Sequence, residues 1–400
     1  MTDIHKVKKI ILFKGQIETL GYFSEELAKA FVGMGYEVYM FDFDKDRRGI
    51  NDLIWFCEKE NTVMITFNFI GINGEEIFET GNGETFWDQR EILCVNIIVD
   101  HPFYYHELLK KPPKRYILFC VDQNHVRYME RFFPDIRYVS FLPLGGTRIS
   151  EVFIPYEERK YDIVFTGNYT PPHTFDKYIN RIDEDYAAFY RSIIDDLIHN
   201  PDKTIEEAIE RRTRTEIEGL TEEDLKNAFA SMIFIDLYVR FYFRALAVQT
   251  LVDNGFRVDV FGKGWDLLEC RNKKNLICHG SVYSQECICN MRNSRISLNV
   301  MPWFKAGAHD RIFNTMLSKS VCFSDGSTFI REQLTNDKDM ALYSLADMDQ
   351  LPVIAGDILS NPDKAKCIAE NGYQKALVNH SWQNRAVTLS EYINRECFWE

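Results

Sequence analysis

Three features that would mark other classes of protein are missing from this sequence. No stretch approaches 18 unbroken apolar residues, and the opening MTDIHKVKK contains no signal-peptide core, so we expect a cytoplasmic protein without an integral membrane span. The ten cysteines form no CxxC pair, the closest two being Cys287 and Cys289, which leaves zinc sites and redox motifs without support. The phosphate-loop pattern GxxxxGK(S/T) is absent, and no internal repeat is evident.

The charge balance excludes a further class. The 47 Lys and Arg residues are outnumbered by 60 Asp and Glu residues, for a net charge of −13. A nucleic-acid backbone would be repelled by most of such a surface, so we expect no nucleic-acid partner. A local basic pocket for one phosphorylated ligand remains compatible with this total. With 400 residues and a 46% hydrophobic content, the chain predicts two or three globular domains with sizeable cores.

The first third of the chain predicts an α/β domain over residues 1–155. Lys9–Phe13 and Tyr36–Phe41 are typical of strands, and Ser24 is a suitable N-cap for a helix between them, which makes a βαβ unit. Further apolar runs of strand length follow, separated by polar or helical stretches: Val63–Phe67, Cys94–Val99, Tyr116–Val121 and Tyr138–Phe141. We therefore expect a parallel sheet in this domain.

The pattern starts again near residue 155 and predicts a second α/β domain over 156–380. Tyr161–Thr166 is its first expected strand, and later ones are Arg257–Phe261, Leu276–His279, Ile296–Val300, Val321–Ser324 and Met340–Tyr343. Residues 172–234 are charged and helix-prone, and we interpret them as a helical insertion beside the ligand cleft or at a homo-oligomer contact. Ser381 caps a last helix, expected over 381–397, that joins the first domain.

Six segments in the second half carry a resemblance to a known family. They are YDIVFTGNY (161–169), RVDVFGKGW (257–265), ICHGSV (277–282), SRISLNVM (294–301), HDRIFNTMLSKSVCFSD (309–325) and SWQNRAVTLSEYI (381–393). In order and spacing they resemble the strand–loop landmarks of the spore maturation CgeB-like glycosyltransferases. The resemblance implies a GT-B fold, in which two Rossmann-like domains face a cleft. It also implies metal-independent, hexosyltransferase-type transfer from a nucleotide-diphosphate sugar to a hydroxyl of a saccharide, protein or other acceptor.

The resemblance places the donor-binding residues in the second domain. Arg311, at the expected start of a helix, is assigned to the diphosphate, which backbone N–H groups and a cation can hold. Lys263 lies between Gly262 and Gly264 after a strand, and either contacts the same group or occupies a plain turn. Asp310 flanks Arg311 in the same segment.

Three further donor-side candidates each have a structural alternative. Asn314 stands where many GT-B enzymes carry an acidic residue for the ribose; an amide can hydrogen-bond a hydroxyl but carries no charge. Asn168 either faces the cleft or is a turn residue. His279 either borders the base pocket or is a hydrogen-bonded structural histidine.

The first domain supplies the candidates for catalysis. Asp100 and His101 follow the strand Cys94–Val99 and precede Pro102, and either side chain could take the acceptor proton in an inverting transfer. The alternative is a strand-end turn fixed by Pro102. Asp122 is a second candidate for the base. No DxD-type aspartate pair stands out, so we expect no metal, and no cofactor apart from the nucleotide sugar as co-substrate.

Two other functions stay open at this stage. A sugar-nucleotide epimerase or hydrolase of the same fold would use the donor pocket without an acceptor surface. A non-catalytic nucleotide-sugar-binding protein would keep the fold alone, and Asn314 in place of an acidic residue favours it.

Overall fold

The computed structural model describes residues 7–45, 49–72, 75–78, 80 and 84–395, and the chain forms two compact units. Unit 1 comprises residues 1–145 and 380–400, and unit 2 comprises residues 146–379. This division differs from the predicted boundary between 155 and 156. The reason is that the intervening segment is bonded to unit 2: Thr147 N donates to Asn314 Oδ1 (2.8 Å), and the buried Arg159 donates to Ser294 O (2.8 Å).

Unit 1 contains a six-stranded parallel sheet in the order β2-β1-β3-β4-β5-β6. Its strands are β1 (Lys9–Lys14), β2 (Glu37–Asp42), β3 (Thr62–Phe67), β4 (Leu93–Ile98), β5 (Tyr116–Cys120) and β6 (Val139–Phe141). Every residue of β3, β4 and β5 is buried, as expected for the centre of a parallel sheet. Its helices are α1 (Glu18–Gly33), α2 (Gly49–Phe56), α3 (Phe86–Gln89), α4 (His106–Leu109), α5 (Gln123–Phe132) and α16 (Trp382–Ile393), with short 3-10 turns at Glu76–Phe78 and Pro102–Tyr105.

Two helices of unit 1 pack against each other although they come from opposite ends of the chain. The Phe23 ring of α1 lies 5.1 Å from the Trp382 ring of α16, and the Tyr36 and Ser390 hydroxyls are 2.5 Å apart. Helix α1 begins at Glu18, so the prediction of an N-cap at Ser24 is wrong; Ser24 is buried inside the helix. Leu20 and Phe23 extend the apolar face backwards, which explains the earlier start.

Unit 2 contains a second six-stranded parallel sheet, in the order β12-β11-β10-β7-β8-β9. Its strands are β7 (Tyr161–Thr166), β8 (Val258–Phe261), β9 (Leu276–Cys278), β10 (Ser294–Asn299), β11 (Val321–Asp325) and β12 (Ala341–Tyr343). The helices outside the insertion are α10 (Ile233–Asp253), α11 (Ser284–Arg292), α12 (Asp310–Leu317), α13 (Thr328–Gln333), α14 (Gln350–Ser360) and α15 (Pro362–Asn379). Shorter 3-10 turns lie at Tyr156–Glu158, Pro172–Phe175, Trp265–Leu267 and Lys273–Asn275. The predicted α/β fold with two parallel sheets is confirmed.

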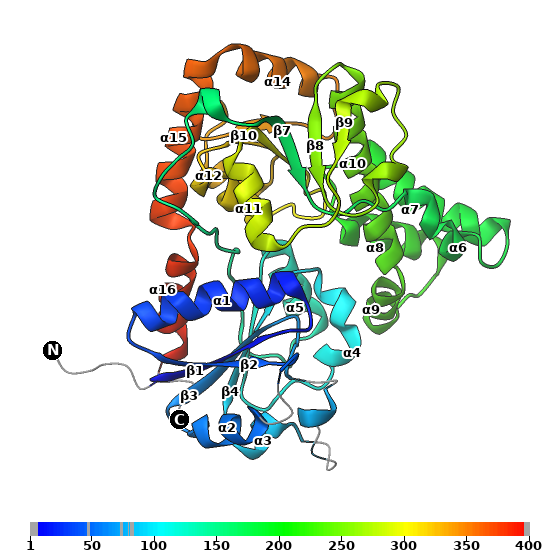
Figure 1. The fold of residues 1–400 in the computed structure, drawn as a ribbon. Helices are drawn as coiled ribbons and strands as arrows, with labels where there is room; N and C mark the ends of the chain where they lie inside the picture. The colour runs from blue at the N-terminus through cyan, green and yellow to red at the C-terminus, as the bar shows by residue number, and fades with distance from the viewer. Residues whose placement is uncertain (1–6, 46–48, 73–74, 79, 81–83, 396–400) are drawn as a thin grey trace. The chain divides into compact units, whose positions relative to one another are not determined.

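The predicted insertion, residues 172–234, folds into helices between β7 and α10. They are α6 (Asp176–Ile179), α7 (Glu184–His199), α8 (Ile205–Glu216) and α9 (Glu222–Ser231), drawn in green beside the β8–β9 side of the sheet in Figure 1. Capping boxes at Thr204 and Thr221 fix the starts of α8 and α9. Lys305, in the loop after β10, donates to Pro201 O between α7 and α8, so the insertion is bonded to the body of unit 2.

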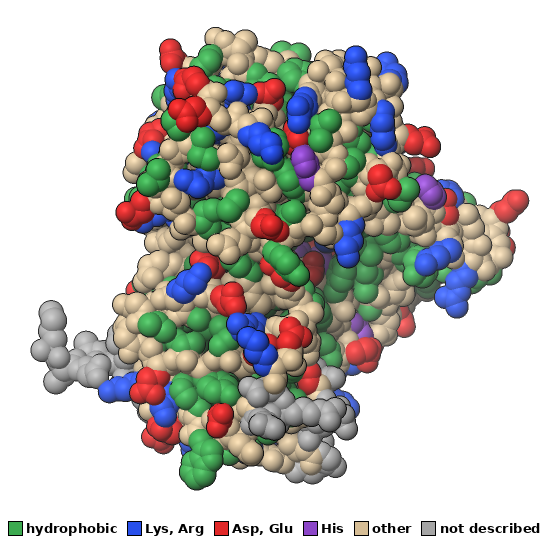
Figure 2. Space-filling view, viewed as in Figure 1, with side chains coloured by type: hydrophobic (Ala, Val, Ile, Leu, Met, Phe, Trp, Pro, Cys, Tyr) green, Lys and Arg blue, Asp and Glu red, His purple; other side chains and the backbone are tan. Residues whose placement is uncertain are grey.

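The strand order of unit 2 marks where a ligand would bind. The chain runs from β7 outward through β8 and β9, then returns to β10 on the other side of β7. The loops after β7 and β10 therefore diverge at the carboxyl edge, which is the preferred ligand position in open α/β sheets. In the described part of the chain, no helix combines the length and hydropathy that a membrane crossing requires. Figure 2 shows acidic and basic side chains intermixed over the visible face of each unit.

Candidate functional site

Three loops are bonded backbone to backbone at the carboxyl edge of unit 2. Gly167 N, after β7, donates to Phe261 O of β8 (2.8 Å), and Tyr169 N donates to Lys263 O (2.9 Å). Gly262 N in turn donates to Gly280 O after β9 (2.7 Å). The loops that follow β7, β8 and β9 are therefore held together at this edge. They carry the predicted donor-side residues Asn168, Gly262, Lys263, Gly264 and His279.

The two glycines around Lys263 are required by this close approach. A Cβ on Gly262 would lie 2.1 Å from Gly167 O, and a Cβ on Gly264 would lie 2.2 Å from Tyr169 O. Lys263 N donates to Asn168 Oδ1 (2.9 Å), while the side chains of Lys263 and Asn168 are exposed. Backbone packing alone thus explains why glycine is needed at positions 262 and 264. A diphosphate contact by Lys263 or Asn168 stays a prediction.

We expect Gly262→Ala to destabilise the protein by clearly more than Gly255→Ala. Both glycines have positive φ, 154° and 95°, and a left-handed conformation costs an L residue about 1–2 kcal/mol. Gly255 has open space where its Cβ would lie, whereas Gly262 would push the β7 loop away. Urea unfolding of both variants measures the difference. Equal losses of unfolding free energy would contradict the close packing of these loops.

Arg311 has two unsatisfied buried donors among the described residues, and its contact with the diphosphate stays a prediction. It is the second residue of α12, where His309 Nδ1 caps the helix by accepting from Arg311 N (3.3 Å). The side chain is only 6% exposed, and its Nη1 donates to Thr166 O at the end of β7. Nε and Nη2 are buried and have no hydrogen-bond partner among the described residues. Buried donors are normally satisfied, so these two nitrogens are available to an anionic ligand.

A second arginine, which the sequence analysis did not single out, lies beside the same loop. Arg244 of α10 is 8% exposed; its Nη1 donates to Asn168 O (3.0 Å), and its Nε is buried without a hydrogen-bond partner in the described residues. The guanidinium lies 5.1 Å from the Trp303 ring centroid, and that of Arg240 lies 4.2 Å from the same ring. The sequence signal was the spacing of Arg240 and Arg244 by one helical turn.

The remaining residues predicted around Arg311 are bonded to one another. Asn314 Nδ2 donates to Asp310 Oδ2 (2.9 Å), and Asn314 Oδ1 accepts from Thr147 N (2.8 Å). The Asp310 carboxylate also lies 2.6 Å from His309 Nδ1. Burial, and next the positive charge of Arg311, lower the pKa of His309 to about 4. Both ends of the Asn314 amide are thus used within the chain, and the ribose contact of Asn314 stays a prediction.

His279 has strong contacts within the protein. Its Nε2 lies 2.7 Å from Asp259 Oδ1, a fully buried carboxylate, and its ring stacks on Phe261 with centroids 4.3 Å apart. These contacts favour the structural alternative for His279. Its contact with a nucleotide base stays a prediction.

A buried carboxylate at the end of β11 gives unit 2 a pH-dependent element. Asp325 is 3% exposed, and its Oδ1 accepts from Met301 N (2.8 Å). Burial raises the pKa of Asp325 to about 6, although the positive charges of Lys305 and Arg311 act to lower it. Because the folded pKa exceeds the unfolded value, Asp325 contributes stability at acidic pH that is lost as the pH rises through about 6.

Asp325→Asn should therefore gain stability relative to the wild type as the pH rises. The amide keeps an acceptor for Met301 N but carries no charge to bury. The shift to about 6 corresponds to a relative gain of about 1–2 kcal/mol between pH 5 and pH 8. Chemical unfolding at both pH values measures it, with the fully exposed Asp363→Asn as control. A difference that does not change with pH would contradict the burial effect.

In unit 1 the two predicted catalytic residues, Asp100 and His101, differ in exposure and in their contacts. Asp100 is half-buried at the carboxyl end of β4, and its Oδ2 accepts from Asn68 Nδ2 (3.2 Å) and Tyr105 Oη (3.3 Å). His101 is 5% exposed, its Nδ1 accepts from Phe103 N (3.2 Å), and its ring lies 4.0 Å from that of Phe103. Asp100 is thus the more accessible of the pair, while His101 caps a 3-10 turn.

Two other features of unit 1 bear on these candidates. Asp122 is 1% exposed and caps α5 by accepting from Asn124 N (2.7 Å), so its contacts are those of a helix cap. Asn68 and Phe69 both have positive φ, 49° and 65°, directly after β3. Asn68 N donates to Ile97 O and Phe69 N to Asn96 Oδ1, which hold this unusual turn beside Asp100.

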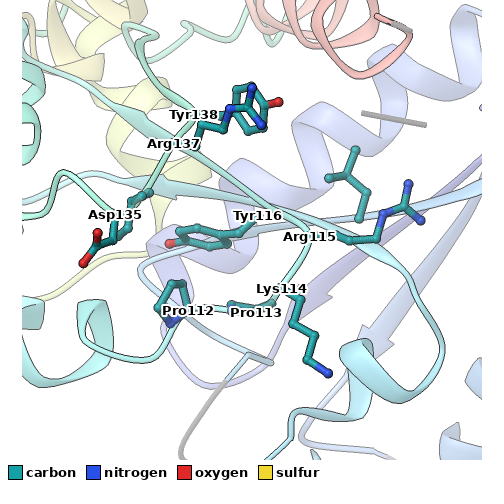
Figure 3. Close-up of a pocket in the computed structure, with 10 residues that line it drawn as sticks. Pro112, Pro113, Lys114, Arg115, Tyr116, Asp135, Arg137 and Tyr138 are labelled. Atoms are coloured by element: carbon teal, nitrogen blue, oxygen red, sulfur yellow. The ribbon is translucent and has the colours of Figure 1, made fainter. Parts of the chain in front are cut away.

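A pocket of about 270 Å³ lies at the opposite, amino edge of the unit 1 sheet. Figure 3 shows Pro112 and Pro113 below the Tyr116 ring and Asp135 to one side. The lining residues precede or begin β4, β5 and β6: Leu93, Pro112, Pro113, Lys114, Arg115, Tyr116, Asp135, Ile136, Arg137 and Tyr138. Because parallel strands place their carboxyl ends at the other edge, this pocket is separate from Asp100.

Comparison with protein families gives one match, to part of the chain. Residues 240–391, less than half of the chain, match a family model described as glycosyl transferase-like. This range includes Arg244, Lys263, His279 and Arg311, together with most of α16. No curated protein sequence matches the chain.

Solved structures with a similar fold cover nearly the whole chain. An α-glucosyltransferase in complex with UDP and a 13-mer DNA superposes with a TM-score of 0.57 at 11% identity, over 96% of this chain and 98% of that one. HepE from Anabaena, in complex with UDP and glucose, gives 0.53 at 11% identity over 96% and 99%. Sucrose-phosphate synthase from Thermosynechococcus elongatus gives 0.52 at 10% identity over 98% and 100%. At such identities the likeness concerns the fold, and the predicted GT-B fold is confirmed.

Proposed function

We propose that the protein is a glycosyltransferase that moves a sugar from a nucleoside-diphosphate sugar to a hydroxyl acceptor. The observation that carries this proposal is Arg311, whose buried Nε and Nη2 have no partner in the described residues. They lie at the topological switch point of unit 2, where nucleotides bind in folds of this kind. The match of residues 240–391 to a glycosyl transferase-like family gives independent support.

The chemistry of the transfer suits these groups. When the bond between the sugar and the nucleotide breaks, negative charge grows on the departing diphosphate. A fixed guanidinium stabilises that charge without reorganising, and charge-assisted hydrogen bonds are the strong ones. Arg311 is held in place by Thr166 O and by the close contact at Gly167, where a Cβ would lie 2.8 Å from Nη1. Arg311 thus acts as a preorganised donor to the leaving group.

The identity of the donor, the kind of transfer, the acceptor and the location are finer parts of the proposal. UDP-sugars are the first donors to test, because two of the solved structures with a similar fold are complexes with UDP, one of them with glucose as well. The sequence resemblance implies hexosyl transfer, membership of the CgeB-like family and a saccharide, protein or other hydroxyl acceptor, and these stay predictions. The absence of a cofactor was expected because no DxD-type aspartate pair stands out, and it stays a prediction too. A cytoplasmic location and assembly through the insertion also stay predictions.

One screen tests the function. The purified protein is incubated with a panel of nucleotide sugars, with and without hydroxyl acceptors, and the release of free nucleotide is measured. Acceptor-dependent release with a glycosylated product is the expected result. Release or conversion without any acceptor would identify a hydrolase or an epimerase instead. Binding without any chemistry would leave a non-catalytic nucleotide-sugar-binding protein.

A further inference from the structure

The pocket at the amino edge of the unit 1 sheet lies away from the edge that carries Asp100, and the proposed transfer makes no use of it. Its volume is about 270 Å³, and Figure 3 shows the Tyr116 ring at its centre, above Pro112 and Pro113. Sites for drug-sized ligands measure about 300–1,000 Å³. This pocket therefore suits a smaller ligand, such as one sugar ring with one charged substituent, and it is too small for a whole nucleotide sugar.

Contacts within unit 1 hold the walls of this pocket in place. Tyr116 is 7% exposed, and its hydroxyl accepts from Asn96 Nδ2 (2.9 Å) in the middle of β4. Arg115 Nη1 donates to Glu91 O (2.6 Å), which fixes the guanidinium at the wall. The pocket is thus formed by bonds of the protein itself before any ligand binds, as most ligand sites are.

One side of the pocket is positively charged, although the whole chain has a net charge of −13. The segment 110–115, KKPPKR, contains four basic residues and no acidic one. Lys114 and Arg115 extend to the same side in Figure 3, and Lys114 is paired with Glu84 (2.5 Å). Arg137, also in the lining, has no carboxylate partner among the described residues. Guanidinium groups bind phosphate and carboxylate particularly well, so this side favours an anion.

The other side of the pocket carries a single carboxylate. Asp135 lies across Tyr116 from Arg115 in Figure 3, and it has neither a hydrogen bond nor an ion pair within the part of the chain that the structure describes. A carboxylate repels an anion but accepts hydrogen bonds from hydroxyl groups. A ligand that suits both sides therefore has an anionic group at one end and hydroxyl groups at the other. A phosphorylated sugar has this arrangement, and the two prolines offer a non-polar surface to its C–H groups.

We propose that this pocket is a second, non-catalytic ligand site that binds a small phosphorylated sugar. Arg115 and Arg137 bind the phosphate, and Asp135 accepts hydrogen bonds from the sugar hydroxyls. The inference goes beyond the proposed function and does not depend on it, because it uses no residue of unit 2 and no step of the transfer.

The test is isothermal titration of the full chain with glucose 6-phosphate and ribose 5-phosphate, and with glucose and inorganic phosphate as partial probes. At least one sugar phosphate should bind tenfold more tightly than either partial probe, because only a sugar phosphate reaches both sides of the pocket. An excess of UDP should leave that affinity unchanged, because a nucleoside diphosphate is too large for this pocket.

Variants assign the binding to the pocket. Arg137→Gln should weaken the sugar phosphate at least tenfold. Asp135→Asn should reduce its preference over inorganic phosphate at least threefold, because the amide is a weaker acceptor for hydroxyls and no longer repels an anion. Both side chains are exposed, so both variants should fold. The matched control is Arg295→Gln, because Arg295 is paired with Asp162 at the amino edge of the other sheet. Arg311→Gln should also bind the sugar phosphate like the wild type.

Three results would overturn the inference and leave the glycosyltransferase proposal standing. The first is wild-type protein that binds neither sugar phosphate at millimolar concentration. The second is equal affinity for a sugar phosphate and for inorganic phosphate. The third is binding that UDP or Arg311→Gln abolishes while Arg137→Gln preserves it, which would place the probe in unit 2. Failure of the nucleotide-sugar screen would overturn the proposed function alone.

Discussion

Arg311→Ala should weaken the binding of a nucleoside diphosphate by about 1.5–3 kcal/mol, roughly 10- to 150-fold, in a protein that remains folded. The variant removes the two buried nitrogens, Nε and Nη2, that have no partner within the described chain. It also removes the bond to Thr166 O, which is a contact within the protein. Titration calorimetry with UDP measures the loss, and circular dichroism checks the fold.

Two further variants make the result specific. Arg311→Lys keeps a positive charge but loses the planar fork of donors, so it should bind with intermediate affinity. Arg295→Ala removes an arginine whose partners are Asp162 and Glu157 O, and it should bind like the wild type. Unchanged nucleotide affinity in folded Arg311→Ala would remove Arg311 from the site.

Asp100→Asn should lower kcat by about 10²–10⁴ while nucleotide binding stays intact, if the transfer inverts the anomeric centre. Asp100 is the more accessible of the two predicted bases, and Asn68 and Tyr105 orient its Oδ2. The amide keeps the size of the side chain and cannot take a proton from the acceptor. Steady-state kinetics with the donor found in the screen provides the measurement. Asp363→Asn, fully exposed at the start of α15, is the control.

His101→Ala should act differently, through stability. Its ring is packed against Phe103 and lies 4.4 Å from that of His125, so its loss leaves a cavity in unit 1. Near-normal turnover in Asp100→Asn and in a folded His101→Ala variant would place the base elsewhere. A retained anomeric configuration, determined by NMR of the product, would explain the same kinetics, because front-face retaining transfer needs no such base.

The sequence predicted the architecture well because its strongest signals are local. Val63–Phe67 and Cys94–Val99 are apolar runs interrupted only by Thr66 and Asn96, which is typical of the centre of a parallel sheet, and they form β3 and β4. The starts of α8 and α9 depend on local contacts as well, because Thr204 and Thr221, each followed three residues later by an acidic residue, form capping boxes there.

The parts that sequence reasoning missed depend on contacts between distant residues. The bond from Thr147 N to Asn314 assigns residue 147 to unit 2, and no local pattern reveals it. The sequence left a plain turn at Gly262–Gly264 as one of two alternatives, and only the structure shows that Gly167 O and Tyr169 O occupy the space that side chains would need there. The spacing of Arg240 and Arg244 places both on one face of α10, but periodicity does not tell which neighbour that face meets.

The helical insertion carries a consequence for how this chain can vary. It ends directly on α10, the helix that bears Arg240 and Arg244, and Pro201 O accepts from Lys305 in the loop that also holds Trp303. We therefore expect a change in the length or packing of residues 172–234 to shift α10 and with it Arg244, which donates to the Asn168 carbonyl. The insertion is not an independent module that can be exchanged freely. Chimeras that swap it should be built with α10 and the 301–309 loop from the same parent.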